Sequence, residues 1–290
     1  MVCLLQRALN GFLVAFQLAL QRSLIVEQRS MTSAVIKVAK VGGAILDNPQ
    51  ALAAFLQAIA VSQVPVVLVH GGGTTVDQQL QQAGFISEKV NGQRVTAVEH
   101  MPIITGALAG TTNKKIVAAA HGAGLKAVGL SLADGPMCAL KRVAALGCVG
   151  EPMANAEKLP GVELLQLLLS SGFFPIVSSI GLDQDQTLCN VNADYAAAAI
   201  AMALNAELLL FSDVPAILDG HNNPINEISL AEARLLLSQP FIQGGMQVKL
   251  KAAILAAERS RRSTAIAGWA DAQTVVAVLQ GECLGTHIRV

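Results

Sequence analysis

Two glycine runs in this 290-residue chain each follow an apolar segment and precede a helix-like one. The first is KVGG at residues 40–43, and the second is VHGGG at residues 69–73. Glycine lets the backbone approach a ligand closely, and free N–H groups at a helix start attract anions. In a parallel sheet, ligands bind beyond the carboxyl ends of the strands. The two loops are therefore predicted to face each other across one phosphate group.

Lys40 is the residue beside these loops that could act on a phosphate. A lysine in a buried strand is costly unless its ammonium reaches solvent or an anion. Lys40 directly adjoins the first glycine run, so we expect it to reach a bound phosphate. Lys37 serves as the comparison, and we expect it at the strand start, in solvent. The loops match neither the P-loop pattern nor G-x-G-x-x-G, which argues against a P-loop enzyme and a nucleotide-binding oxidoreductase.

Two further segments carry polar side chains at suggestive spacing. NGQRVT at residues 91–96 predicts a hairpin in which Arg94 is either solvated or clamps a carboxylate in bidentate fashion. NVNAD at residues 190–194 precedes an apolar helix, and Asn192 or Asp194 could simply cap it. Asp194 could also orient lysines, and Asn190 could bind a substrate.

A second lysine follows a third glycine pair. In FIQGGMQVKLKAA, residues 241–253, Lys249 lies in the first turns of a helix, where a positive charge is unusual. Such a lysine is expected to have an anion close by, whereas Lys251 is expected in solvent. His70 adjoins the second glycine run, and we expect a strand-end histidine bonded to backbone rather than a catalytic base.

Strands and helices alternate along the remainder of the chain. The strands read as continuous apolar runs, which indicates a mostly parallel sheet buried on both faces. The expected strands are 34–41, 65–70, 126–132, 174–180, 207–213 and 263–268, and the expected helices are 48–60, 74–84, 161–172, 193–206 and 245–260.

Composition excludes several other classes. With 20 basic and 20 acidic residues the chain has no net charge, which argues against a nucleic-acid partner. The five cysteines form no C-x-x-C pair and predict free thiols rather than disulfides or zinc. The uncharged span 164–182 is interrupted by Ser-Ser-Gly and Pro, so we expect no transmembrane helix. Residues 1–30 could form an amphipathic helix, or translation could start at Met31.

Together these segments resemble the amino-acid kinase superfamily, and within it the N-acetyl-L-glutamate kinases. The resemblance extends over essentially all of residues 34–290, and the order of nine motifs is far more specific than any one of them. The motifs are KVGGAILD, VHGGGTTVD, NGQRVTAVE, ITGALAGTTNKKIV, PIVSSIG, NVNADYAA, FSDVPAILDG, GGMQVKLKAA and the closing GTHI.

The resemblance implies a three-layer αβα sandwich with an open, mostly parallel central sheet. Residues 31–290 would form a single kinase domain, in which 31–205 bind the acceptor and 206–290 bind ATP. By motif position, the implied catalytic residues are Lys40, Lys249 and Asp194, and the implied substrate-binding residues are Gly72, Gly73, Arg94 and Asn190. The implied phosphate-binding residues are Gly42 and Gly43, and the implied nucleotide-binding residues are Asp213, Val214, Pro215, Ala216, Ile217, Leu218, Phe241, Ile242 and Gln243.

The chain departs from the family pattern at two places in the implied nucleotide site. Pro215 and Ala216 stand where small Ser-Gly-like residues are expected, and Gln243 and Gly244 stand where a Thr-Asp pair is frequent. These departures affect individual adenine and ribose contacts rather than the location of the site.

The implied reaction transfers a phosphoryl group from ATP, with Mg²⁺, to the side-chain carboxylate of N-acetyl-L-glutamate, an early step of arginine biosynthesis in the cytoplasm. That carboxylate is ionised at neutral pH, so no general base is needed. The alternatives are another carboxylate or carbamate kinase, and a non-catalytic sensor on the same fold. The segment before GTHI lacks a glycine-rich effector-site pattern, so we expect an arginine-insensitive homodimer, although residues 1–30 could be the helix that links dimers into hexamers in arginine-sensitive relatives.

Overall fold

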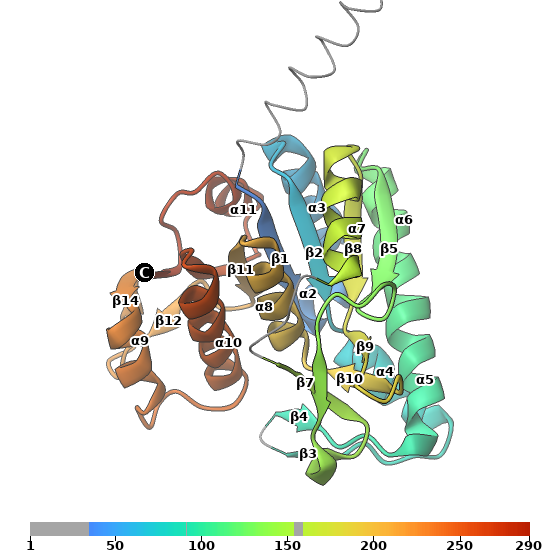
Figure 1. Ribbon diagram of the computed structural model, residues 1–290. Coiled ribbons are helices and arrows are strands. Elements are labelled where there is room, and N and C mark those ends of the chain that lie inside the picture. Colours follow the sequence, from blue (N-terminus) through green and yellow to red (C-terminus); the bar gives the residue numbers. More distant parts are fainter. Residues whose placement is uncertain (1–34, 91, 154–158) are drawn as a thin grey trace, which may run out of the picture. The chain divides into compact units, whose positions relative to one another are not determined.

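The computed structural model of the chain describes residues 35–90, 92–153 and 159–290. The predictions made for residues 1–30 and Met31 lie outside these ranges. An eight-stranded sheet forms the centre of the described part, in the order β14-β16-β15-β11-β1-β2-β8-β5 (Figure 1). Its neighbouring strands pair in parallel except β15 and β16. The strands are β1 Lys37–Val41, β2 Val66–His70, β5 Ala127–Ser131, β8 Phe174–Ser178, β11 Glu207–Ser212, β14 Glu227–Ser229, β15 Thr264–Gly268 and β16 Thr286–Arg289.

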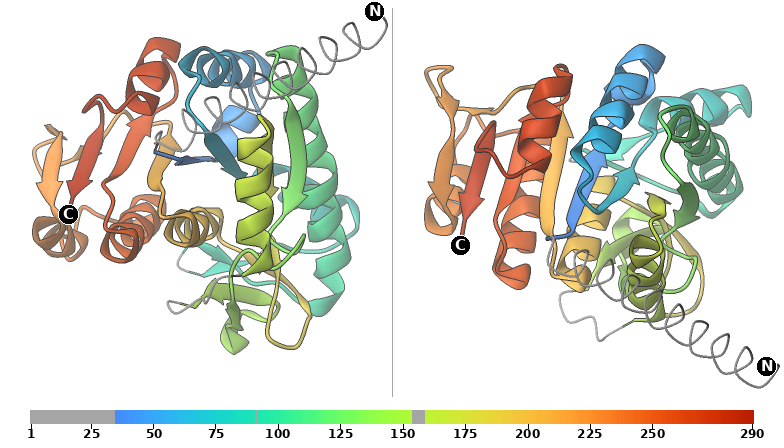
Figure 2. Two further views of the ribbon diagram at one scale, coloured as in Figure 1. Left: turned by 45° about the horizontal axis from the view of Figure 1, so that its top comes forward. Right: turned by 90° about the horizontal axis from the view of Figure 1, so that it is seen from above.

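Helices cover both faces of this sheet, as the predicted αβα sandwich requires (Figure 2). Alternate residues of β1 show why, because Val38 packs into one buried cluster while Ala39 and Val41 pack into the other. One face is covered by α3 Pro49–Ser62, α6 Asn113–Gly122 and α11 Ala272–Leu279. The other is covered by α7 Pro160–Ser170, α8 Ala193–Leu204, α9 Leu230–Leu237 and α10 Gly244–Ser260.

Smaller elements lie beyond the carboxyl ends of the central strands. A four-stranded sheet has the order β6-β7-β10-β9, and two hairpins are formed by β3 with β4 and by β12 with β13. The strands are β6 Leu140–Arg142, β7 Val149–Pro152, β9 Ile180–Leu182, β10 Leu188–Val191, β3 Lys89–Val90, β4 Gln93–Arg94, β12 Ile217–Leu218 and β13 Pro224–Ile225. The short helices are α2 Gly43–Leu46, α4 Gly73–Gln82 and α5 Met101–Thr105, with 3₁₀ turns η1 Val98–His100 and η3 Ala144–Leu146 and the π-helical segment η2 Gly106–Thr112.

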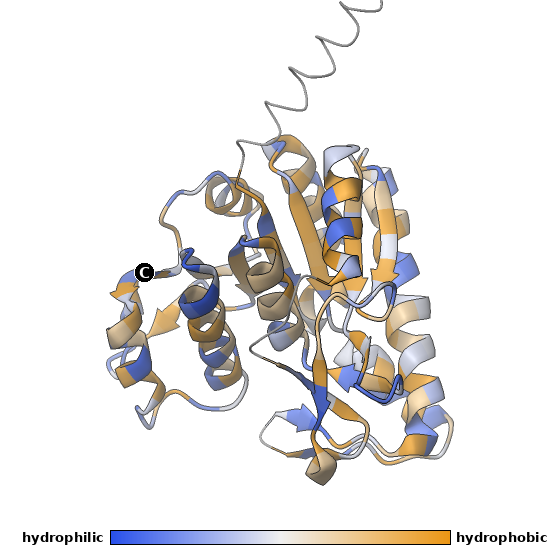
Figure 3. Cartoon of the chain, in the orientation of Figure 1, coloured by the Kyte–Doolittle hydropathy of each residue, from blue (hydrophilic) through white to orange (hydrophobic). Residues whose placement is uncertain are grey.

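Local sequence signals account for most of these boundaries. Asn48 caps α3 by accepting a hydrogen bond from the Ala51 N–H, and Pro49 occupies the first helical position. Gly84 follows α4 with a positive φ of 82°. Strands β1, β2 and β8 are buried along their whole length, and in Figure 3 the central strands are mostly hydrophobic while the helices around them carry both hydrophobic and hydrophilic residues. These features confirm the predicted parallel sheet.

The prediction for Lys37 was wrong. Its side chain is only 8% exposed and forms an ion pair with Glu207 of the neighbouring strand β11. Lys37 does lie at the start of β1, as predicted, and this end of the strand is remote from the glycine loops. It is nevertheless a buried, paired charge rather than a solvated one.

Three further predictions concerned a membrane-spanning helix, a metal site and the state of the cysteines. In the described ranges, no helix has the length and apolar character needed to span a membrane. The same residues contain no cluster of three or more His, Cys, Asp or Glu side chains placed to hold a metal ion. The four described cysteines, at positions 138, 148, 189 and 283, are free thiols.

Candidate active site

A cavity of about 260 Å³ opens where the carboxyl ends of β1 and β2 meet. These strands are paired so that Val41 lies opposite His70, and each is followed directly by its glycine run. Residues of both runs, 42–43 and 71–73, line the cavity. The prediction that the two loops face a common space is therefore confirmed. Helices α2 and α4 begin at these loops, so their unpaired N–H groups are available to an anion.

Lys40 and Asp194 form the charged centre of this cavity. Lys40 Nζ lies 2.8 Å from Asp194 Oδ1, and both side chains are less than 10% exposed. Asp194 stands in the first turn of α8, where the helix dipole favours a negative charge. A Cβ added at Gly42 would lie 3.6 Å from Lys40 Nζ, so the ammonium rests against the first glycine loop. The structure thus brings the strand lysine and the aspartate together.

Lys249 approaches the same centre from α10. It is one turn further into the helix than the glycine pair, and a Cβ at Gly245 would lie 3.9 Å from its Nζ. The pKa of Lys249 is lowered, chiefly by burial and further by Lys40, although Asp194 and Asp213 act to raise it. Lys249 is half-buried, with its ammonium beside the third glycine pair. As expected, the neighbouring Lys251 is exposed.

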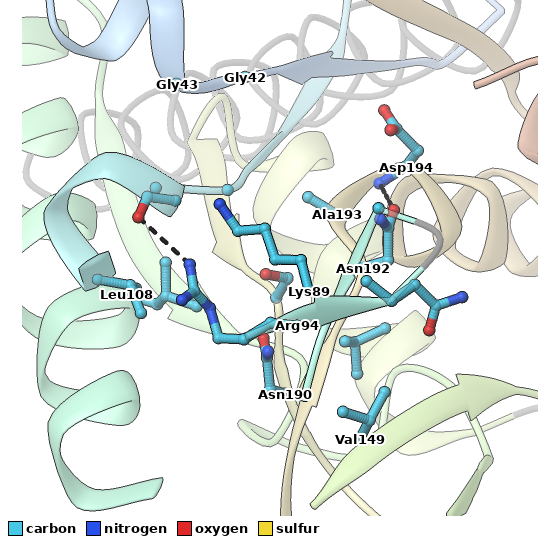
Figure 4. A pocket seen from close by; sticks show the side chains of 18 of the residues that line it. Gly42, Gly43, Lys89, Arg94, Leu108, Val149, Asn190, Asn192, Ala193 and Asp194 are labelled. Carbon is cyan, nitrogen blue, oxygen red and sulfur yellow. Dashed lines mark hydrogen bonds between the residues drawn. The ribbon is translucent and has the colours of Figure 1, made fainter. Parts of the chain in front are cut away.

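Arg94 enters the cavity from the β3–β4 hairpin, as Figure 4 shows. The hairpin was predicted, but the solvated alternative for Arg94 is excluded because its side chain is only 8% exposed. Its Nη1 donates to Asp77 Oδ1 and to Ser87 Oγ, and its Nη2 donates to the Gly73 carbonyl at 3.4 Å. The guanidinium is therefore fixed against the start of α4, next to the second glycine loop.

Asn190 and Asn192 have different roles in the segment before α8. Asn192 caps the helix by accepting a hydrogen bond from the Asp194 N–H, which confirms the capping alternative for this residue. Asn190 lines the cavity from β10 and donates to Thr96 Oγ1 at 3.2 Å. Asp194, although in the same helix turn, is turned to Lys40, as the alternative of a lysine-orienting role predicts.

Two charged residues of this region escaped the sequence analysis. Lys89 lines the cavity from β3, and its Nζ lies 3.0 Å from Asp77 Oδ2. Partial burial raises the pKa of Asp77, but hydrogen bonds from Arg94, Lys89 and Ser87 outweigh it, and the pKa falls to about 2. The available signal was an acidic residue four positions after Gly73 on the amphipathic α4, which the motif VHGGGTTVD already contains.

His70 holds the second glycine loop in place. The ring is fully buried, and its Nδ1 lies 2.7 Å from the Gly71 carbonyl while its Nε2 lies 3.0 Å from Asn113 Nδ2. Neutral imidazole fits both contacts if Nδ1 carries the proton and Nε2 accepts from the amide. Burial lowers the pKa of His70 to about 4. The predicted backbone-bonded histidine is confirmed.

Residues 36–268 match the model of the Amino acid kinase family. The chain belongs to the amino acid kinase family. An acetylglutamate kinase from Colwellia psychrerythraea is 46% identical over 264 residues, which span 89% of this chain and 99% of the relative. An acetylglutamate kinase from Edwardsiella ictaluri is 45% identical, covering 87% of this chain and 98% of the relative.

Solved structures similar to this amino acid kinase family member support the fold. A carbamate kinase from Giardia lamblia bound to AMP-PNP superposes with a TM-score of 0.67 at 17% identity, covering 88% of this chain and 98% of that one. An N-acetylglutamate synthase from Neisseria gonorrhoeae complexed with coenzyme A and N-acetyl-glutamate gives a TM-score of 0.75 at 20% identity, over 94% of this chain and 63% of that one.

The residues predicted to bind nucleotide lie apart from the cavity. The segment 213–218 follows the carboxyl end of β11, and 241–243 directly precede α10. Ile217 and Ile242 are buried in the hydrophobic core, whereas Phe241 is 42% exposed. Both segments precede Lys249 in the sequence, and Asp213 of the first segment raises the pKa of its ammonium. Their nucleotide contacts stay a prediction.

Proposed function

We propose that this amino acid kinase transfers the γ-phosphoryl group of ATP to the side-chain carboxylate of N-acetyl-L-glutamate, giving N-acetylglutamyl 5-phosphate for arginine biosynthesis. The observation that carries the proposal is the buried Lys40–Asp194 pair between two glycine loops, in a cavity that Arg94 also enters. Relatives with the name acetylglutamate kinase, at 41–46% identity over most of the chain, support the choice of acceptor.

The site is arranged for charge neutralisation rather than for proton transfer. An acceptor carboxylate is ionised at neutral pH and attacks phosphorus directly, with ADP as the leaving group. In this scheme Lys40 and Lys249 stabilise the charge of the moving phosphoryl group, assisted by backbone N–H groups of the glycine loops at 42–43 and 72–73. Asp194 fixes the Lys40 ammonium and holds Lys249 by its field. His70 is neutral and engaged at both nitrogens, so it takes no proton from the acceptor.

Arg94 and Asn190 are assigned to the acceptor. A guanidinium binds a carboxylate in bidentate fashion, which suits the α-carboxylate of N-acetyl-L-glutamate. The Asn190 amide, already oriented by Thr96, faces the same cavity and can hydrogen-bond the acetamido group. With the α-carboxylate held at Arg94, the side-chain carboxylate would be directed towards Lys40.

In this proposal Mg²⁺ arrives with the nucleotide. Mg²⁺ keeps several waters and binds through substrate phosphates and one or two carboxylates. When bound, Mg²⁺ would supply positive charge that offsets the charge of the nucleotide phosphates. The nucleotide itself is assigned to residues 213–218 and 241–243, beside Lys249.

Hydroxylamine trapping tests the proposed activity. The purified protein is incubated with MgATP, hydroxylamine and one candidate acceptor, and the hydroxamate formed from an acyl phosphate is measured. Hydroxamate with N-acetyl-L-glutamate, but not with glutamate, aspartate or no acceptor, is the expected result. Folded protein that yields hydroxamate with none of them would favour a sensor, and ATP consumption with carbamate would favour a carbamate kinase.

Both essential lysines are present, which favours the enzyme over the non-catalytic sensor. We also assign the protein to the cytoplasm, because its described cysteines are free thiols and three of them are buried. An arginine-insensitive homodimer is our proposed assembly. Light scattering of the full chain gives its mass with and without L-arginine, and a hexamer or arginine inhibition would contradict this assignment.

A further inference from the structure

We propose that Asp77 is the positioning residue that aims Arg94 at the acceptor, an inference that rests on the proposed function. Asp77 lies on α4 and is not part of the cavity lining. Its two carboxylate oxygens contact two different cations, Arg94 through Oδ1 and Lys89 through Oδ2. Both cations belong to the β3–β4 hairpin and both line the cavity. One carboxylate on α4, outside the cavity lining, thus anchors both cations of the hairpin, Arg94 and Lys89.

The hydrogen bonds of Arg94 explain why this anchoring leaves a binding edge. A guanidinium carries five N–H donors. The two on Nη1 go to Asp77 and Ser87, and one on Nη2 goes to the Gly73 carbonyl. That leaves one donor on Nε and one on Nη2 without an acceptor in the described part of the chain. Two adjacent donors on a planar group are what a carboxylate takes in bidentate fashion.

The hairpin needs such an anchor because its own pairing is short. β3 and β4 contain two residues each, and a two-stranded ribbon of this size has little stability of its own. Its end is held at Thr96, whose N–H donates to Leu146 and whose carbonyl accepts from Cys148. Gln93 adds a long hydrogen bond to Glu151 of β7, and Asp77 supplies the attachment on the side that carries the cations. Without it, Arg94 keeps only Ser87 and a long bond to Gly73.

Charge and position predict opposite results when Asp77 is neutralised, which makes the inference testable. Removing a carboxylate makes the cavity more positive, and by charge alone every anion would bind more tightly. Loss of positioning instead weakens only the binding of the acceptor, whose α-carboxylate Arg94 binds. A misaligned charged hydrogen bond costs about tenfold to a hundredfold in binding. We therefore expect Asp77→Asn to raise the KM for N-acetyl-L-glutamate by that factor.

The experiment compares wild type, Asp77→Asn and Asp185→Asn by the hydroxamate assay. Asp185 is the matched control, because it is exposed on the β9–β10 turn and loses the same charge. In Asp77→Asn the KM for ATP should stay within about twofold of wild type, as should both KM values in Asp185→Asn. An unchanged or lowered acceptor KM in Asp77→Asn would overturn the inference.

An analogue without the α-carboxylate separates positioning from general damage. The inhibition constant of 4-acetamidobutyrate is measured against N-acetyl-L-glutamate in wild type and Asp77→Asn. It should be the same in both, because Arg94 has no α-carboxylate to grip. An equal rise for analogue and acceptor would indicate a distorted cavity and contradict the proposal.

Ser87→Ala provides an independent variant that leaves the charge unchanged. It removes the other Nη1 acceptor of Arg94, so a smaller rise in the acceptor KM alone is expected. If neither Ser87→Ala nor Asp77→Asn raises the acceptor KM, the positioning role is refuted. Two independent variants keep the test decisive even if one of them folds poorly. Wild type that forms no hydroxamate from N-acetyl-L-glutamate would instead refute the proposed function.

Discussion

At the scale of single residues, the site is defined by how its charges are paired. Lys40 is buried against Asp194, Arg94 is tied to Asp77, and Lys249 is partly buried and close enough to Asp194 and Asp213 for its pKa to respond to both. Lys249 therefore has the least direct compensation of these three cations. A group of this kind gains most when a phosphoryl group arrives between it and Lys40.

Replacing Lys249 should slow the reaction with little effect on folding. Lys249→Ala removes one preorganised positive donor, which costs about 2.7–4 kcal/mol, or roughly a hundredfold to a thousandfold in kcat. Lys251→Ala is the control, because this lysine lies two positions further along α10 and is exposed. Turnover in the hydroxamate assay and the thermal midpoint are measured for both variants. Unchanged turnover in Lys249→Ala would refute its assigned role.

His70 should make stability depend on pH. Burial lowers its pKa from 6.5 to about 4, so between these values the unfolded chain binds a proton that the folded chain does not. The part of the free energy of unfolding that depends on a neutral His70 is fully present above pH 6.5. It is lost as the pH falls towards 4, by about 3 kcal/mol in all. Urea unfolding at pH 7, 5.5 and 4 measures this slope. In His70→Asn, which cannot titrate at this position, the loss in the free energy of unfolding between pH 7 and pH 4 should be smaller by that amount. An identical loss would contradict the prediction.

At the scale of elements, the sequence predicted what neighbouring residues determine. The glycine loops, the helix start at residue 48 and the β3–β4 hairpin each depend on a few consecutive residues. Lys37 was misjudged because its partner, Glu207, is 170 positions away and becomes a neighbour only through the β1–β11 pairing. Asp77 and Lys89 were missed for the same reason, since a helix and a hairpin separated in sequence must first be brought together.

Gly147 is an element-scale feature that can be tested by one substitution. It has a positive φ of 77°, and a Cβ there would lie 2.3 Å from the Thr96 carbonyl oxygen, where β7 meets the end of the hairpin. Gly147→Ala should therefore lower the free energy of unfolding by about 2 kcal/mol or more. Gly122→Ala is the control of opposite sign, because it lies in α6 with open space around it and should be neutral or stabilising by up to about 1 kcal/mol.

Denaturant midpoints of these two variants provide the measurement. The acceptor KM of Gly147→Ala should also rise, because Thr96 carries the hydrogen bond that orients Asn190. A Gly147→Ala protein as stable as wild type would mean that the loop before β7 relaxes without cost, and the hairpin would then need another anchor.

At the scale of the molecule, the central sheet joins the two predicted lobes. β1 lies between β2, from the predicted acceptor lobe, and β11, from the predicted nucleotide lobe. Lys37 and Glu207 add a partly buried ion pair across the same junction, at the opposite end of β1 from Lys40. Removing one partner of such a pair leaves an uncompensated charge, which disfavours partial unfolding of either lobe. Residues 36–290 accordingly form one compact unit.

This continuity predicts that both lobes unfold together. Trp269 is the single tryptophan of the chain, lies directly after β15 and packs into the cluster under α11, so its fluorescence reports on the nucleotide lobe. Far-ultraviolet circular dichroism reports on all helices and strands. In urea the two signals should give one midpoint, because separating the lobes would expose both edges of the β1–β11 pairing to water. If fluorescence changed at a clearly lower urea concentration, residues 206–290 would be an independent domain. The lysines at 40 and 249 would then be held together by the substrates rather than by the fold.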